Sequence, residues 1–175
     1  KMINTSSVKQ SLGVNIAISS EMASALQTWT AMYLNQSPWL TTDVKSLNLA
    51  SAIAAEIARA VTIEMEVTLS GSPRAEFLGA QIERVVDRLR LTTEYGVAKG
   101  GLMLKPYISG NQIAVDYVQA DQFYPVAFDA NGNMTACVFS DTKIVGKDFY
   151  TRLEYHALAA DGYQIKNMAY RANTK

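Results

Sequence analysis

The sequence predicts an α+β fold, in which N-terminal helices, including one long amphipathic helix, are followed by an antiparallel sheet of hairpins. Up to about residue 99 the apolar residues recur at the three- and four-residue spacing of helices. From residue 102 onward they alternate with polar residues in short runs, and glycine-containing segments join these runs in pairs. Helices that precede a series of hairpins are typical of α+β proteins.

The chain of 175 residues is long enough for one domain with a real core. Residues 1–19 are rich in Ser, Thr and Asn without a strong period, so we expect a polar N-terminal arm there. Residues 20–175 are expected to form the α+β domain. Because the chain opens on Lys1 and ends on Lys175 without a closing element, we interpret it as a fragment of a longer chain.

Composition narrows the classes of function. Sixteen Lys and Arg residues balance sixteen Asp and Glu residues, which argues against a nucleic-acid surface as the main feature. The single cysteine, Cys137, excludes an internal disulfide framework and is interpreted as a small buried hydrophobe. No run of residues is long and apolar enough to span a membrane, and the start does not resemble a signal peptide.

The first strong helical pattern begins at Ser20. One face of this helix carries Met22, Leu26, Trp29 and Tyr33. Pro38 interrupts the pattern, and we expect a loop there with Trp39 as a second anchor. Two tryptophans left exposed would form a large apolar patch, so this segment is expected to dock on something.

A second helix is predicted over residues 49–62. Its wide apolar face consists of Leu49, Ala52, Ile53, Ile57, Ala60 and Val61. We expect this helix to be buried on most sides or to lie between two partners. Apolar and polar residues then alternate over residues 62–71, which indicates a short strand, with a helix extended through Glu64 as the alternative.

The long helix is the clearest element. Ser72 is expected to cap it and Pro73 to occupy its first position. Its predicted buried stripe consists of Phe77, Leu78, Ile82, Val85, Val86, Leu89 and Tyr95. Gly100 and Gly101 end it, because glycine adopts a positive φ without steric cost. The glycines and lysines of residues 97–107 therefore turn the chain; they lack the Gly-Lys-Ser/Thr of a phosphate loop.

Three hairpins complete the predicted fold. The first joins residues 102–108 and 112–118 around SGN, and the second joins residues 123–129 and 135–141 around ANGNM. Asn131-Gly132 is among the strongest hairpin signals that a sequence gives. The third hairpin joins residues 149–158 and 162–171 around AADG.

Residues that suggest catalysis or metal binding have simpler interpretations. His156 is the only histidine, and we expect a structural role on a sheet face rather than catalysis. Asp129, Asn131 and Asn133 mimic the opening of a calcium loop. The glycine and the glutamate that such a loop needs are missing further along, so a hairpin turn is favoured.

The remaining charged candidates are equally weak. Asp116 and Asp121 suggest an acid–base pair, but as strand-edge and loop residues they need no special explanation. Arg84, Arg88 and Arg90 suggest phosphate contacts, but Glu83, Asp87 and Glu94 lie between them. The motifs therefore predict a binding or scaffold domain, not an enzyme, with no catalytic, cofactor-binding or metal-binding residues.

Four segments, in order along the chain, carry a family likeness. They are WTAMYLNQSPWL, SLNLASAIAAEIARAVTIEMEVTLSGSPRAEFL, EYGVAKGGLMLKPYISGNQIAVDYVQADQFYPVAFDANGNM and FYTRLEYHALAADGYQIKNMAYR. In this order and spacing they resemble the N-terminal part of a tailed-bacteriophage portal protein, of the type found in siphophages and prophages of Gram-positive bacteria. The likeness spans nearly the whole chain from about Ser20.

The resemblance implies a structural subunit of a homo-oligomeric ring, usually of twelve copies, at one vertex of the virion capsid. Such rings let DNA pass during packaging and ejection, and they bind capsid or scaffold protein, the terminase and head-completion proteins. They assemble in the host cytoplasm. This segment would form part of the outer wing, so the resemblance assigns it no DNA contact. It implies no cofactor, metal or membrane partner.

Alternatives remain open at this point. Trp29, Trp39 and the apolar helix either pack between ring neighbours or pack on the same chain. A second functional hypothesis is a small-molecule-binding α+β domain. Its pocket would be lined by Tyr117, Phe123, Tyr124 and Phe128. A third hypothesis, a hydrolase that uses His156, needs a nucleophile and an acid beside that histidine.

Overall fold

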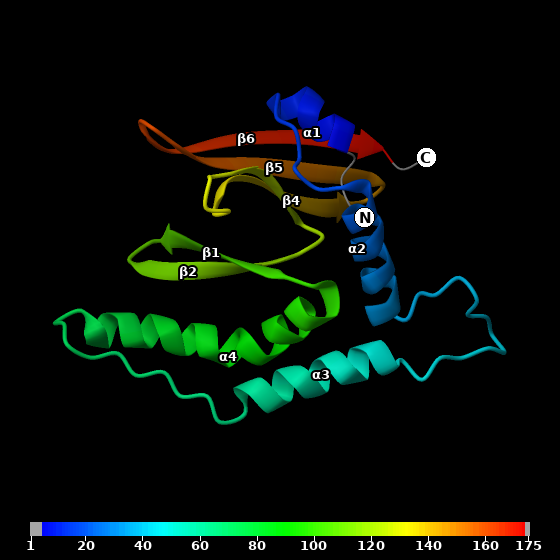
Figure 1. Ribbon diagram of the computed structural model, residues 1–175, viewed down its shortest axis with the longest axis horizontal. Coiled ribbons are helices and arrows are strands. Elements are labelled where there is room, and N and C mark those ends of the chain that lie inside the picture. Colours follow the sequence, from blue (N-terminus) through cyan, green and yellow to red (C-terminus); the bar gives the residue numbers. More distant parts are fainter. Residues whose placement is uncertain (1–4, 174–175) are drawn as a thin grey trace. The chain divides into compact units, whose positions relative to one another are not determined.

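The computed structural model describes residues 5–173 and confirms the α+β fold class, with four helices and two antiparallel sheets in this range (Figure 1). The helices are α1 (Thr5–Leu12), α2 (Ser20–Tyr33), α3 (Leu49–Thr62) and α4 (Ala75–Lys99). The strands are β1 (Leu102–Ser109), β2 (Gln112–Gln119), β3 (Phe123–Phe128), β4 (Met134–Val145), β5 (Asp148–Ala159) and β6 (Gly162–Asn173).

The chain divides into two compact units. The sheet unit combines residues up to 25 with residues from 121 onward, and the helical unit consists of residues 26–120. The sequence predicts one domain over residues 20–175, with residues 1–19 as a separate arm. The start of the chain instead belongs with its end, because it packs on the strands that the last third of the sequence forms.

The sheet unit is a meander of four strands in the order β3-β4-β5-β6. Val138 pairs with Tyr155, and Tyr155 pairs with Lys166 on the next strand. The core of this unit consists of Val8, Tyr124, Val138 and Leu153, each at most 1% exposed. Because paired residues share a face, this register places Val138, Tyr155 and their neighbours on the side of the sheet that the N-terminal segment covers.

The structure corrects the prediction of a polar N-terminal arm. Residues 5–12 form α1, and Val8 on this helix is fully buried in the core of the sheet unit. After α1 the chain runs extended, and the N–H of Ala17 donates to the carbonyl of Pro125 over 2.7 Å. A helix of two turns has only two apolar positions on one face, here Val8 and Leu12, so its period is too short to stand out among polar neighbours.

In the helical unit, α4 packs against α3 on one side and against the β1–β2 hairpin on another (Figure 1). The long helix is confirmed, but it begins at Ala75, two residues after Pro73. Ser72 belongs to the preceding turn, where its Oγ accepts the N–H of Arg74 over 3.2 Å. The predicted end is confirmed, because Gly100 has a φ of 75° directly after Lys99.

The strand predicted over residues 62–71 is wrong. Helix α3 ends at Thr62, and residues 65–70 are neither helix nor strand. Alternation of apolar and polar residues makes a strand only where a neighbouring strand accepts its hydrogen bonds. No described strand pairs with this segment, and Ile63 and Val67 are exposed.

All three predicted hairpins are confirmed, with turns at Gly110, Gly132 and residues 160–161. A fourth hairpin, between β4 and β5, was not foreseen. The β1–β2 pair forms a sheet of its own instead of joining the other four strands. Among residues 5–173, none of the helices combines the length and apolar character that crossing a membrane requires.

Candidate functional site

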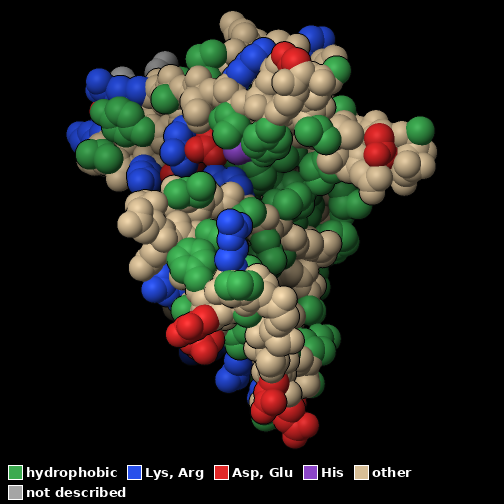
Figure 2. Space-filling view, turned by 90° about the vertical axis from the view of Figure 1, so that its left-hand side faces the viewer, with side chains coloured by type: hydrophobic (Ala, Val, Ile, Leu, Met, Phe, Trp, Pro, Cys, Tyr) green, Lys and Arg blue, Asp and Glu red, His purple; other side chains and the backbone are tan. Residues whose placement is uncertain are grey.

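Large hydrophobic side chains remain exposed on α2, the loop after it and α3, and we call this set the apolar band. Its members are Trp29, Met32, Leu34, Trp39, Val44, Leu47, Leu49, Ile53, Ile57 and Val61, which are between 37% and 85% exposed. Figure 2 shows another face of the molecule, on which hydrophobic side chains (green) also reach the surface among charged ones. Single exposed apolar residues are normal, but a set of ten within one stretch of sequence makes this segment a candidate contact surface.

Helix α3 turns its small residues inward and its large ones outward. Ala54 and Ala58, one helical turn apart, are the buried residues of α3, and α3 packs against α4. Ile53 is 58% exposed, and Leu49, Ile57 and Val61 are exposed as well. The prediction that this helix is buried on most sides is therefore wrong within the described chain, and the alternative, that it lies between two partners, stays a prediction. Alanines bring two helices close together, and the wider apolar side chains then fall beside the contact.

A shallow apolar groove lies between α2, α3 and α4, with a volume of about 160 Å³. Its lining consists of Trp29, Met32, Tyr33, Ala50, Ile53, Ala54, Val97 and Ala98, none of them charged. A cavity of roughly 150 Å³ lined by apolar side chains holds a benzene ring. The groove therefore has the size and the chemistry to take one apolar side chain.

The walls of this groove are held by specific contacts. A Cβ at Gly100 would lie 2.9 Å from Cζ3 of Trp29, so glycine lets the indole lie on the end of α4. The hydroxyl of Tyr33 donates to Oε1 of Glu94 over 2.7 Å, and its ring meets Tyr95 edge-on. Burial first, and then the hydrogen bond to Glu94, raise the pKa of Tyr33.

The loop of residues 34–48 presents the most exposed members of the band. Asn35 and Asn48 near its ends have positive φ angles, a conformation that asparagine tolerates better than most residues. Inside the loop, Oγ1 of Thr41 accepts the N–H of Val44 over 3.1 Å. Trp39 is 66% exposed and Leu47 is 85% exposed. Local hydrogen bonds thus shape the loop, while its apolar side chains point to solvent.

The structure separates the two tryptophans that the sequence analysis treated together. Trp29 packs on Gly100 of its own helical unit, whereas Trp39 contributes little to the interior. Packing within the same chain therefore accounts for most of the burial of the Trp29 side chain. The Trp39 side chain is left largely exposed by such packing.

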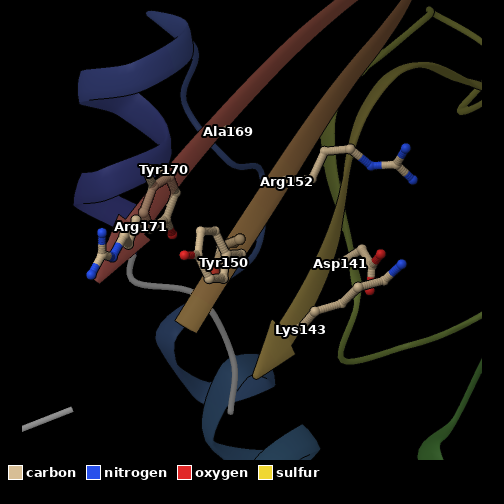
Figure 3. A pocket seen from close by; sticks show the side chains of 8 residues that line it. Asp141, Lys143, Tyr150, Arg152, Ala169, Tyr170 and Arg171 are labelled. Carbon is tan, nitrogen blue, oxygen red and sulfur yellow. The ribbon is translucent and has the colours of Figure 1, made fainter. Parts of the chain in front are cut away.

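A polar hollow of about 420 Å³ lies on strands β4, β5 and β6 of the sheet unit (Figure 3). Its lining consists of Asp141, Lys143, Tyr150, Thr151, Arg152, Ala169, Tyr170 and Arg171. The arginines are paired, Arg152 with Glu154 over 3.1 Å and Arg171 with Asp148 over 2.7 Å. Three acids thus balance three bases, which disfavours a strong anion site.

His156 lies on β5, as the sequence predicts, and it is less than a tenth exposed. Its Nδ1 lies 2.6 Å from the hydroxyl of Tyr163, and its ring meets Phe139 edge-on. Its Nε2 lies 3.5 Å from Glu154. Cys137 is the direct partner of His156 across the β4–β5 ladder, a proximity that the sequence analysis did not foresee. Both side chains are buried, which leaves little surface for a substrate.

Asp129 organises the β3–β4 turn. Its carboxylate accepts the N–H groups of Asn131 and Asn133 and the side-chain amide of Asn133, at 2.8 to 2.9 Å. These hydrogen bonds, led by the one from the Asn133 side chain, lower the pKa of Asp129. Within residues 5–173 no group of three or more His, Cys, Asp or Glu side chains is arranged to hold a metal ion.

The structure does not assemble the other candidates into a site. Asp116 pairs with Lys105 over 3.4 Å in the helical unit, whereas Asp121 belongs to the sheet unit. Arg84 donates to the side chain of Gln112, and Arg88 and Arg90 are exposed on α4.

The four aromatic residues expected to line a pocket have separate environments. Tyr124 lies in the core of the sheet unit and Phe128 is half exposed. Tyr117 belongs to the helical unit, where its hydroxyl donates to the carbonyl of Val85 over 3.4 Å. Phe123 starts β3 and pairs with Phe139. None of the four lines the groove or the hollow.

Comparisons with protein-family models, curated proteins and solved structures found no match to this chain.

Proposed function

We propose that this chain is part of the wing of a phage portal subunit, a structural protein that acts by assembling into a ring and not by catalysis. The apolar band is the observation that carries the proposal. In a ring each subunit has a neighbour on both sides, and surfaces that are exposed in one copy become buried in the assembly. The four sequence segments that resemble portal proteins supply the class of ring.

The size of the band supports a subunit contact. The band has ten large side chains, which are about half exposed on average. A stable interface buries about 800 Å² of surface from each partner. Covering the band in a subunit contact would remove this apolar surface from water.

The charge of the chain fits a position away from the DNA. A surface that follows DNA needs an excess of Lys and Arg, because each phosphate contact releases counterions. This chain has sixteen residues of each sign. In the proposed ring, DNA passes through a channel built by other segments, and the wing faces neighbouring subunits and capsid or scaffold protein.

The solution mass of the longest natural form of the chain tests this proposal, with the 175-residue chain measured beside it by light scattering. We expect a closed ring of about twelve copies for the long form. A long form that stays monomeric under all assembly conditions would contradict the proposal and favour the small-molecule-binding alternative.

A further inference from the structure

We propose that Trp39 of one copy inserts into the groove between α2, α3 and α4 of another copy. This inference rests on the proposed function in one respect, namely that the partner of the apolar band is a second copy of the chain. It goes further by naming the two surfaces that meet, which are the loop around Trp39 and the groove lined by Trp29, Ile53 and Val97.

The loop has the features of an inserting segment. Trp39 is 66% exposed, and tryptophan is among the residues that contribute most to binding when a partner covers it. Residues 36–42 carry no charge, so inserting them removes no ionised group from water. The N–H of Leu40 donates to the carbonyl of Ser37 over 3.1 Å, which shapes the backbone around Trp39 before any contact forms.

The groove has the matching features. At about 160 Å³ it is the size of a cavity that holds one benzene ring, so it takes the six-membered edge of the indole, and its lining has no charged residue. Ile53 and Met32 line it and are still about half exposed, so an inserted side chain would remove them from water. Methionine adapts to irregular contacts because its side chain is unbranched.

The other large surface feature does not compete for Trp39. The hollow on β4, β5 and β6 is lined by Asp141, Lys143, Arg152 and Arg171, whose ionised groups are unsuited to an indole. Of these two hollows, the groove is therefore the one that matches Trp39 in chemistry.

Cross-linking between two differently labelled chains tests the contact. In a Cys137→Ala background, one chain carries Ser37→Cys beside Trp39, and the other carries Ala50→Cys on the groove wall. Both chains are mixed with a short bis-maleimide. We expect the mixed pair to cross-link in preference to either chain with itself, because the loop of one copy meets the groove of another.

Two variants and one matched control make the test specific. Adding Trp39→Ala to the loop-labelled chain is expected to weaken the cross-linking association by about tenfold or more. Filling the groove with Ala98→Leu is expected to weaken it as well, while leaving the loop unchanged. Leu158→Ala is the control, because Leu158 is also 66% exposed but lies on β5, and it is expected to leave the yield unchanged.

Several results would overturn the inference. One is a cross-linking yield that Trp39→Ala leaves unchanged. Others are a preference for cross-links between like chains and an absence of cross-links between folded chains. The last is a chain that carries both Ser37→Cys and Ala50→Cys and cross-links within itself. The solution mass of the long form tests the proposed function separately. A ring without the mixed cross-link keeps the portal proposal and removes this contact. A mixed cross-link in an assembly that stops at two copies keeps the contact and removes the ring.

Discussion

The two units of this protein solve the problem of burying apolar surface differently. The sheet unit encloses four large side chains completely, namely Tyr124, Leu153, Val8 and Val138, each at most 1% exposed. Other large side chains of this unit, such as Ile144 and Leu158, are exposed. In the helical unit the most buried apolar side chains are alanines, Ala54 and Ala58. Leu26 and Val118 are buried as well, but most of the large apolar residues of this unit are at least partly exposed. Because burial of large side chains supplies most of the stabilisation of a fold, the sheet unit has the better core of its own.

In the proposed ring, this difference identifies the helical unit as the part that a neighbouring subunit completes. Buried positions on α4 include Gln81, Thr92 and Lys99, so even the long helix buries polar groups where a self-sufficient core would place aliphatic ones. The apolar residues that are missing from the interior are found in the apolar band. In the proposed ring, the helical unit therefore gains more burial of apolar surface from assembly than its own interior provides.

The largest expected effect separates the two units directly. Leu153→Ala removes a fully buried side chain and is expected to lower the free energy of unfolding by about 2–5 kcal/mol. Ile53→Ala removes a side chain of similar size that is 58% exposed, and is expected to change it by less than about 0.5 kcal/mol in the unassembled chain. Denaturant unfolding measures both, and equal losses would break the comparison.

A smaller loss of stability is expected from replacing Gly100 at the end of α4, for which Gly132 in the β3–β4 turn is the reference. Gly132→Ala places a side chain at a positive φ with open space around it, at a cost of about 1–2 kcal/mol. Gly100→Ala is expected to cost more, because its Cβ would also lie 2.9 Å from Trp29. Adding Trp29→Ala should remove the excess of the Gly100 variant in a double-mutant cycle. An excess that persists without Trp29 would show that the indole is not the obstacle.

Next in size is the hydrogen bond between Tyr33 and Glu94. Tyr33→Phe is expected to lower the free energy of unfolding by about 1 kcal/mol near neutral pH. Since the folded pKa of Tyr33 is raised above its ordinary value of 10.0, the protonated hydroxyl stabilises the fold below pH 10. As the pH rises above 10, the difference between the wild type and Tyr33→Phe should narrow. A difference that stays constant up to the alkaline limit of folding would contradict this account.

The smallest effect is expected in the β3–β4 turn. Asp129→Ala removes a carboxylate whose pKa the Asn133 and Asn131 hydrogen bonds lower, so a slightly lower melting temperature is expected at neutral pH. This stabilisation is present above the ordinary Asp value of 3.8 and is lost as the pH falls through the lowered folded pKa. Melting curves of both proteins should therefore converge in acid. A difference in melting temperature between the two proteins that widens below pH 4 would contradict the stabilising role of the ionised Asp129 carboxylate.

The elements that the sequence predicts well are those in which local chemistry decides the structure. Gly100 ends α4 because the backbone there needs a positive φ, and Asn131-Gly132 sets a hairpin because few other pairs turn so tightly. The bounds of α3 follow from its long apolar period. In these cases the local sequence alone determines where the element begins, turns or ends.

The elements that it misses depend on partners distant in sequence. Val8 is a core residue because β4 and β5 supply its neighbours, and an isolated valine among polar residues carries no such sign. Residues 62–71 alternate like a strand, but no described strand pairs with them. The sequence also does not predict which face of α3 is buried. Ala54, Ala58 and Ile53 all count as apolar in a sequence pattern, and only the packing of α3 against α4 shows that the two alanines face inward.

The environment of Trp39 in the assembled protein tests the central claim most directly. In a Trp29→Phe chain, Trp39 is the sole tryptophan, and its fluorescence reports on its own contact with water. We predict that emission shifts to shorter wavelength and becomes protected from iodide when the long form assembles, with the dilute 175-residue chain as the exposed reference. Emission and quenching that stay the same in ring and monomer would contradict the claim that another copy covers this surface.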